Sequence, residues 1–90
     1  MAISVVVPAY NEAGRIRAVL EPILASTLVD EIIVVDDGSE DATADEAGRF
    51  PVRVIRLPEN RGKASALDAG VSVAKNDVFL FLDADLVGLR

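Results

Sequence analysis

The chain has 90 residues, 51% of them hydrophobic, which allows one small folded domain and excludes a disordered tail. The formal net charge of −6 argues against nucleic-acid binding, because no basic face is available to neutralise phosphates, and a phosphate ligand would need a metal ion or clustered cations. Cysteine and histidine are both absent, which excludes disulfides and leaves oxygen ligands, suited to Mg²⁺ or Mn²⁺, for any metal site.

The first half of the chain alternates apolar runs with helical patterns. A strand is predicted over Ile3 to Val7. Apolar side chains between residues 16 and 24 then recur at i, i+3, i+4, i+7 and i+8, which predicts an amphipathic helix that Pro22 should kink or end early. A second strand is predicted over Glu31 to Val35, followed by a shorter helix over Asp41 to Phe50.

The second half continues the alternation. A third strand is predicted over Val52 to Arg56, where Arg53 and Arg56 favour an edge position in the sheet. A helix over Lys63 to Ala74 and a fourth strand over Asp77 to Leu82 complete the order β-α-β-α-β-α-β. This order predicts an α/β protein with an open parallel sheet built from βαβ units with right-handed crossovers.

Polar residues follow every predicted strand. Ligands of open parallel sheets bind outside the carboxyl ends of the strands, where these residues should converge. They are Pro8, Ala9, Tyr10, Asn11 and Glu12; Asp36, Asp37, Gly38 and Ser39; Asn60, Arg61, Gly62 and Lys63; and Asp83, Ala84 and Asp85. Each cluster alone is also typical of a turn or helix cap, but their convergence on one edge favours a binding site.

Two features of this edge indicate a metal and a diphosphate. Asp83 and Asp85 are two residues apart on an extended chain, so both carboxylates point to one face and can share a divalent cation. Lys63 falls in the first turn of a helix, where the helix dipole disfavours a cation. A bound phosphate would explain this lysine, although a solvated lysine is the more common case.

The segment after the first strand argues against other classes of nucleotide or phosphoryl-binding protein. A dinucleotide-binding Rossmann unit requires Gly-X-Gly-X-X-Gly there, and Val7 to Tyr10 contain no glycine. The P-loop pattern is also absent. A receiver domain would place an acidic pair at this point, and a sugar nucleotidyltransferase a glycine-rich basic loop, and neither is found.

Four segments agree with the motifs of a known family, in its order and approximate spacing: Val5 to Glu12, Ile33 to Ser39 with Asp41 and Thr43, Asn60 to Gly70, and Asp83 to Asp85. On these segments the chain resembles the N-terminal, nucleotide-sugar-binding half of a family 2 glycosyltransferase with the GT-A fold. The resemblance covers essentially all 90 residues.

The resemblance implies a nucleotide site and a metal site. The implied nucleotide-binding residues are Pro8, Ala9, Tyr10, Asn11, Glu12, Asp36, Asp37, Gly38, Lys63, Asp83 and Ala84. Within this set, Asp37 would accept a hydrogen bond from the base, Asp36 would support the loop or the ribose, and Lys63 would lie near the nucleotide. Asp85, together with Asp83, would hold the Mn²⁺ or Mg²⁺ that bridges the diphosphate.

The resemblance also implies an activity and its missing parts. The expected function is metal-dependent binding of a nucleotide-diphospho-sugar, with UDP-sugar favoured and GDP-mannose second, for glycosyl transfer to an unknown acceptor. Residues 1–90 would form a single partial domain, truncated after the fourth strand. The acceptor half and the catalytic base are expected beyond Arg90, so we expect the 90 residues alone to be inactive. The alternative is a non-catalytic truncated or split nucleotide-binding module that needs a partner.

Two expectations concern the environment of the chain. The longest apolar runs are far shorter than the roughly 20 residues of a membrane span, and Met1 to Ile3 lack the basic start of a signal peptide. We therefore expect a cytoplasmic protein, with the cytoplasmic membrane face as the alternative for full-length relatives. The run Val78 to Leu82 would form an exposed apolar edge strand, which predicts self-association.

Overall fold

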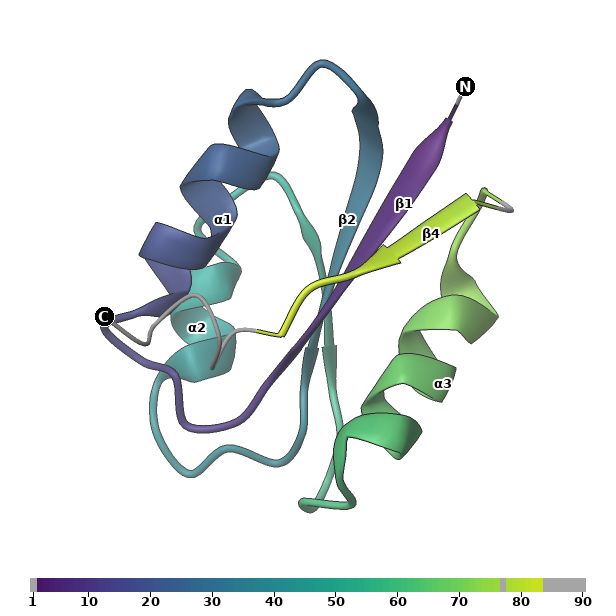
Figure 1. The fold of residues 1–90 in the computed structure, drawn as a ribbon. Coiled ribbons are helices and arrows are strands. Elements are labelled where there is room, and N and C mark those ends of the chain that lie inside the picture. The colour runs from purple at the N-terminus through teal and green to yellow at the C-terminus, as the bar shows by residue number, and fades with distance from the viewer. Residues whose placement is uncertain (1, 77, 84–90) are drawn as a thin grey trace.

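The computed structural model describes residues 2–76 and 78–83. It contains four parallel strands in the order β3-β2-β1-β4, with helices on both faces of the sheet (Figure 1). The elements are β1 (Ile3–Ala9), α1 (Ile16–Ala25), β2 (Val29–Asp36), α2 (Thr43–Ala47), β3 (Arg53–Arg56), α3 (Lys63–Val73) and β4 (Val78–Phe81). The predicted order of elements and the parallel sheet are confirmed.

The two central strands are longer than predicted at their carboxyl ends. Pro8 pairs with Val35 and Ala9 with Asp36, so three residues expected in the site loops lie within strands. Pro8 has no N–H to donate, but its neighbours continue the ladder, and the Asp37 N–H donates to the Ala9 carbonyl at 2.8 Å. The ladder therefore fixes the starting points of both loops relative to each other.

The core is divided between the two faces of the sheet. Successive strand residues point to opposite faces, so Val5 packs with α1 and Val6 packs with α3. Burial on both faces explains why the strands are continuously apolar rather than alternating. The result is a three-layer arrangement in which α1 and α2 lie on one side and α3 lies on the other (Figure 1).

α3 approaches β1 very closely at Gly70. A Cβ built on Gly70 would lie 2.4 Å from Val6 Cγ1, which is well inside van der Waals contact. Glycine lowers helix propensity by about 1 kcal/mol relative to alanine, so its presence inside α3 is explained by packing. This contact sets the distance between α3 and the sheet.

Two helix boundaries differ from the prediction. α1 continues past Pro22 to Ala25, so the expected early end is wrong. Pro22 lies on the exposed face, while Leu20 and Ile23 are buried and hold the helix on the sheet. α2 is only five residues long, because Asp41 accepts the N–H of Thr43 at the helix start and the helix ends at Gly48.

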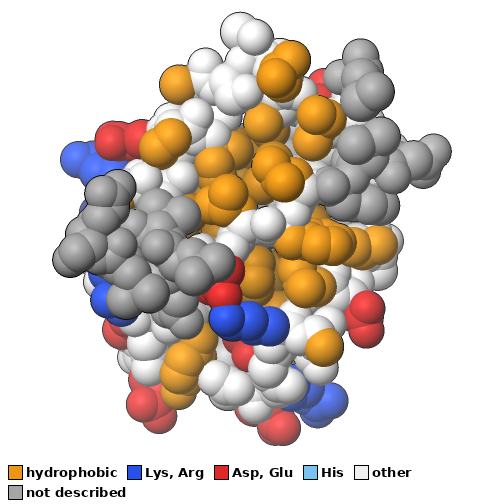
Figure 2. Space-filling model, viewed as in Figure 1, with side chains coloured by type: hydrophobic (Ala, Val, Ile, Leu, Met, Phe, Trp, Pro, Cys, Tyr) orange, Lys and Arg blue, Asp and Glu red, His pale blue; other side chains and the backbone are white. Residues whose placement is uncertain are grey.

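The edges of the sheet are β3 and β4. β3 occupies the edge predicted from Arg53 and Arg56, and β4 lies beside β1 at the other edge. Leu80 and Phe81 of β4 are each 51% exposed, and apolar side chains gather on the face of the molecule that contains β4 (Figure 2). Asp77, the predicted first residue of this strand, lies outside the described residues.

Within the described residues, no helix combines the length and the apolar character that a membrane span requires.

Candidate functional site

A small cavity of about 40 Å³ lies at the carboxyl edge of the sheet. It is lined by Pro8, Ala9, Tyr10, Glu12, Asp37, Lys63, Ala66 and Asp83. All of these except Ala66 were predicted from the sequence as site residues, so residues from three loops and α3 meet as expected. Ala66 is a buried alanine in the helical pattern of α3, and nothing in its type distinguishes it from an ordinary core residue.

Of the predicted site residues that the structure describes, three do not line this cavity. Asn11 lies in the loop after β1 with a positive φ of 53°, and its amide oxygen accepts the Glu40 N–H at 3.0 Å. Asp36 is fully buried at the end of β2. Gly38 has φ of 74°, and a Cβ there would lie 2.4 Å from the carbonyl carbon of Glu59. Gly38 therefore permits close packing of two loops.

Asp37 joins the loop after β2 to the start of α3. Its carboxylate is buried and accepts two main-chain hydrogen bonds, from the Arg61 N–H at 2.9 Å and from the Gly62 N–H at 2.8 Å. Gly62 has φ of 96°, a conformation that glycine adopts without strain. The sequence indicated Asp37 as a ligand residue but gave no sign of this connection.

The two carboxylate oxygens of Asp36 have different hydrogen-bonding environments. Oδ1 accepts the Ser39 N–H at 2.9 Å, which closes a tight turn after β2. Oδ2 is buried and, among the described residues, receives no hydrogen bond; the nearest cation is Arg56, with Nε 3.9 Å away. A buried carboxylate oxygen normally has a donor, so this atom is suited to a hydroxyl or a water.

Charged side chains face one another across the cavity. Lys63 of α3 forms an ion pair with Asp83, which follows β4 and is 18% exposed. Buried Glu12 forms an ion pair with Arg15, with Nε and Oε1 separated by 2.8 Å. The sequence did not single out Arg15. Tyr10 is 42% exposed, so its ring is accessible at this edge.

Of the two predicted metal ligands, Asp83 and Asp85, the structure describes only Asp83. Ala84 and Asp85 lie outside the described residues. Within residues 2–76 and 78–83, no group of three or more acidic side chains is arranged to hold a metal ion. Asp83 supplies one hard oxygen ligand at the cavity, which is the kind of ligand that Mn²⁺ and Mg²⁺ prefer.

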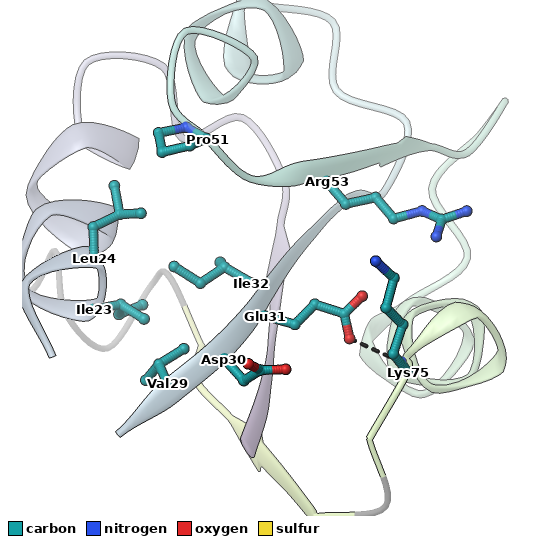
Figure 3. Close-up of a pocket in the computed structure, with 9 residues that line it drawn as sticks. All are labelled: Ile23, Leu24, Val29, Asp30, Glu31, Ile32, Pro51, Arg53 and Lys75. Atoms are coloured by element: carbon teal, nitrogen blue, oxygen red, sulfur yellow. Dashed lines mark hydrogen bonds between the residues drawn. The ribbon is translucent and has the colours of Figure 1, made fainter. Parts of the chain in front are cut away.

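A larger cavity of about 290 Å³ lies at the amino ends of β2 and β3, opposite the carboxyl ends that form the candidate site. It includes none of the predicted site residues. Figure 3 shows apolar side chains, among them Leu24 and Ile32, on one side of β2 and the charged side chains of Glu31, Arg53 and Lys75 on the other. The Lys75 main-chain N–H donates to Glu31 at 2.9 Å. The residues that line this cavity include no carboxyl end of a strand, which is where open parallel sheets bind their ligands, so this cavity is not part of the candidate site.

Comparison with known proteins identifies the family. A family model described as glycosyl transferase family 2 matches residues 4–88. The chain belongs to glycosyltransferase family 2. It is similar to a curated family 2 relative, the dolichyl-phosphate beta-glucosyltransferase of Drosophila melanogaster, with 41% identity over 94% of this chain and 31% of that protein.

Solved structures of similar proteins support the same family 2 assignment. A mannosyltransferase from Pyrobaculum calidifontis in complex with GDP-Man and Mn²⁺ superposes with a TM-score of 0.84 and 31% identity, over 92% of this chain and 27% of that chain. The glucosyl-3-phosphoglycerate synthase of Mycobacterium tuberculosis, in complex with Mn²⁺, UDP and glucosyl-3-phosphoglycerate, superposes with a TM-score of 0.79 and 36% identity. This match covers 92% of this chain and 33% of that chain. The predicted GT-A type of α/β fold is confirmed.

This family 2 chain spans about a third of the length of the relatives that it matches.

Proposed function

We propose that this family 2 chain binds a nucleotide-diphospho-sugar and forms the donor-binding part of a metal-dependent glycosyltransferase. The observation that supports this proposal best is the convergence of Tyr10, Glu12, Asp37, Lys63 and Asp83 around one cavity at the carboxyl edge of the sheet. Parallel α/β sheets bind nucleotides at this edge. Family membership supports the reaction type, and the position of the cavity supports this edge as the site of donor binding.

The proposed cation is Mn²⁺, with Mg²⁺ as the alternative, held by Asp83 and Asp85. Both similar structures named above contain Mn²⁺. The net charge of −6 supports the need for a cation, because an acidic chain repels a diphosphate. When bound, the cation supplies positive charge that stabilises the diphosphate leaving group as the glycosidic bond breaks.

Different side chains would contact different parts of the donor. Tyr10 and Glu12, on the loop after β1, would contact the base and ribose, and Asp37 would accept a hydrogen bond from the base. Asp36 would support this loop or the ribose through Oδ2, which has no hydrogen-bond donor among the described residues. Lys63 would contact a phosphate, because it is the cation that lines the cavity.

The described cavity can hold only part of a donor. Its volume of about 40 Å³ is well below the roughly 300–1,000 Å³ of pockets that bury a whole ligand of drug size. The described residues therefore form one wall of the proposed donor site.

The acceptor surface and the catalytic base would lie beyond Arg90. The alternative function is a non-catalytic nucleotide-binding module that is completed by a partner, which the short coverage of the relatives also allows.

Calorimetric titration of the 90-residue chain with UDP and GDP, each with and without Mn²⁺, tests this proposal. We expect binding of one nucleotide, UDP before GDP, that requires Mn²⁺ and is lost in Asp83→Ala and Asp85→Ala. Glu21→Gln is the control, because Glu21 lies on α1 and pairs only loosely with Arg17, at 3.7 Å. Absence of binding by a folded sample would contradict a preformed donor site.

A further inference from the structure

We infer that Ser39, Asp41, Thr43 and Glu46 are positioning residues that hold the loop after β1 in its nucleotide-binding shape and occupy the main-chain N–H groups of residues 11 to 14, so that these groups are not available to phosphate. The inference rests on the proposed function for its consequence and on the described contacts for its geometry. None of these four residues lines the cavity. They would act on the ligand only through the loop.

Four consecutive main-chain N–H groups in this loop each donate to a different side chain. The donors are residues 11 to 14, and the acceptors all come from the eight-residue segment 39–46. The Asn11 N–H donates to Ser39 Oγ at 2.8 Å and the Glu12 N–H to Thr43 Oγ1 at 2.8 Å. The Ala13 N–H donates to Asp41 Oδ2 at 3.2 Å and the Gly14 N–H to Glu46 Oε1 at 2.8 Å.

Two of the acceptors, Thr43 and Asp41, hold each other in place. Thr43 is fully buried, and its hydroxyl donates to Asp41 while it accepts from Glu12. The Asp41 oxygen that accepts this hydroxyl also accepts the Thr43 N–H at 3.0 Å. The Thr43 hydroxyl lowers the pKa of the Asp41 carboxyl below its ordinary value, so the acceptor stays ionised. Asp41, Thr43 and Glu12 therefore form a short chain of hydrogen bonds.

This arrangement lies immediately before α1, next to a helix start of the kind where many α/β proteins bind phosphate. The first turn of a helix has N–H groups without helical partners, and phosphates bind to them in other nucleotide-binding folds. Here residues 11 to 14 donate to protein side chains, and the next two N–H groups, of Arg15 and Ile16, donate to the Glu12 carbonyl at 2.9 and 3.0 Å. A phosphate would have to displace two carboxylates that repel it.

The same loop places Tyr10 and Glu12 at the cavity. Holding residues 11 to 14 from the far side fixes these two side chains without using any atom that faces the ligand. Since the N–H groups of residues 11 to 14 are occupied, the diphosphate would bind near Lys63 and Asp83, which also line the cavity. The base and the phosphates therefore bind to separate parts of the site.

Amide hydrogen exchange, measured by NMR on the ligand-free 90-residue chain, tests the positioning. We expect Thr43→Val and Asp41→Ala each to speed exchange at residues 11 to 14 by about tenfold, since a buried hydrogen bond is lost. Exchange at Ala66 in α3 should stay unchanged. Asp41→Asn should restore protection only in part, because Asp41 accepts through both oxygens and asparagine keeps a single acceptor oxygen. Asp45→Ala is the charge-matched control on the exposed side of α2. Unchanged exchange at residues 11 to 14 would overturn the inference.

Ligand titration in the presence of Mn²⁺ tests the separation of base and phosphate. In Thr43→Val and Asp41→Ala, we expect the Kd for UDP to rise about tenfold and the Kd for inorganic pyrophosphate to change less than about twofold. An equal loss for both ligands would overturn the assignment, because it would show that phosphate binding also depends on this loop. If the wild-type chain bound no nucleotide while exchange responded as expected, the proposed function would fail and the positioning of the loop would stand.

Discussion

Lys63 lies at the start of α3 and Asp83 follows β4, so two different elements bring these side chains to the cavity. Their ion pair places a cation beside the carboxylate proposed to bind metal. A metal ion and Lys63 would then compete for Asp83. A nucleotide diphosphate would remove this competition, because Lys63 can contact a phosphate while the metal contacts Asp83.

We expect Lys63→Met to separate metal binding from nucleotide binding. In the absence of nucleotide, Mn²⁺ should bind about two- to fivefold more tightly, since an exposed lysine that competes for Asp83 is gone. With Mn²⁺ present, UDP should bind about tenfold more weakly, because a phosphate contact is lost. Titration calorimetry measures both. Lys75→Met is the control, because Lys75 lines the larger cavity, away from the candidate site. Equal affinities in Lys63→Met and wild type would contradict the role of Lys63.

Among the elements, α3 has two functions. Its first turn contains Lys63 and Ala66 at the cavity, and its third turn contains Gly70 against β1. The distance between α3 and the sheet at Gly70 therefore affects the position of Lys63. Asp37 adds a second connection, because it holds the main chain just before α3.

A double-mutant cycle on Gly70 and Val6 measures this packing. Gly70→Ala should lower the free energy of unfolding by about 1–3 kcal/mol despite the better helix propensity, because the new Cβ meets Val6 Cγ1. Val6→Ala removes that methyl group, so the double variant should lose less stability than the sum of the two single variants, by about 1–2 kcal/mol. Urea unfolding of the four proteins gives the coupling.

Val5 offers the matched control for this cycle. It is as buried as Val6 but points to the other face of the sheet, toward α1. Gly70→Ala and Val5→Ala should therefore be additive within about 0.5 kcal/mol. Additivity in the Val6 cycle as well would show that α3 does not rest on Val6.

The elements also show how far the sequence determines the fold and the site. Apolar runs predicted all four strands, and Arg53 and Arg56 identified the edge strand correctly, because burial decides residue type over a whole element. The hydrogen bonds between residues 11–14 and 39–46 were not predicted. Serine, threonine and carboxylate side chains accept main-chain N–H groups in many turns, so only the fold shows which distant segment they contact.

At the scale of the whole molecule, β4 forms an apolar edge of the sheet that the described residues make. Leu80 and Phe81 are half exposed there, and the described residues supply no strand beyond β4. The unpaired N–H and C=O groups of such an edge can pair with another chain. The chain spans 31% of the Drosophila relative, so a longer protein has ample sequence to supply a further strand.

We expect the 90-residue chain to self-associate through this edge. Sedimentation velocity should show a mass that increases with concentration in the micromolar range, and Leu80→Lys should shift the distribution toward monomer, because charge on an edge strand opposes pairing. Leu28→Lys is the control, since Leu28 is 70% exposed but lies between α1 and β2. A monodisperse monomer for the wild-type chain would contradict this expectation.

The hydrogen bonds that hold residues 11 to 14 have a consequence for how nucleotide preference can change in this family. The main chain of the loop is fixed by acceptors that lie outside the cavity, so its shape does not depend on the side chains that it presents there. Exposed Tyr10, which we propose to contact the base, could then be exchanged for a residue suited to another base while the loop keeps its course. Selection for a new donor could proceed one substitution at a time, without a destabilised intermediate that must be rescued elsewhere in the fold.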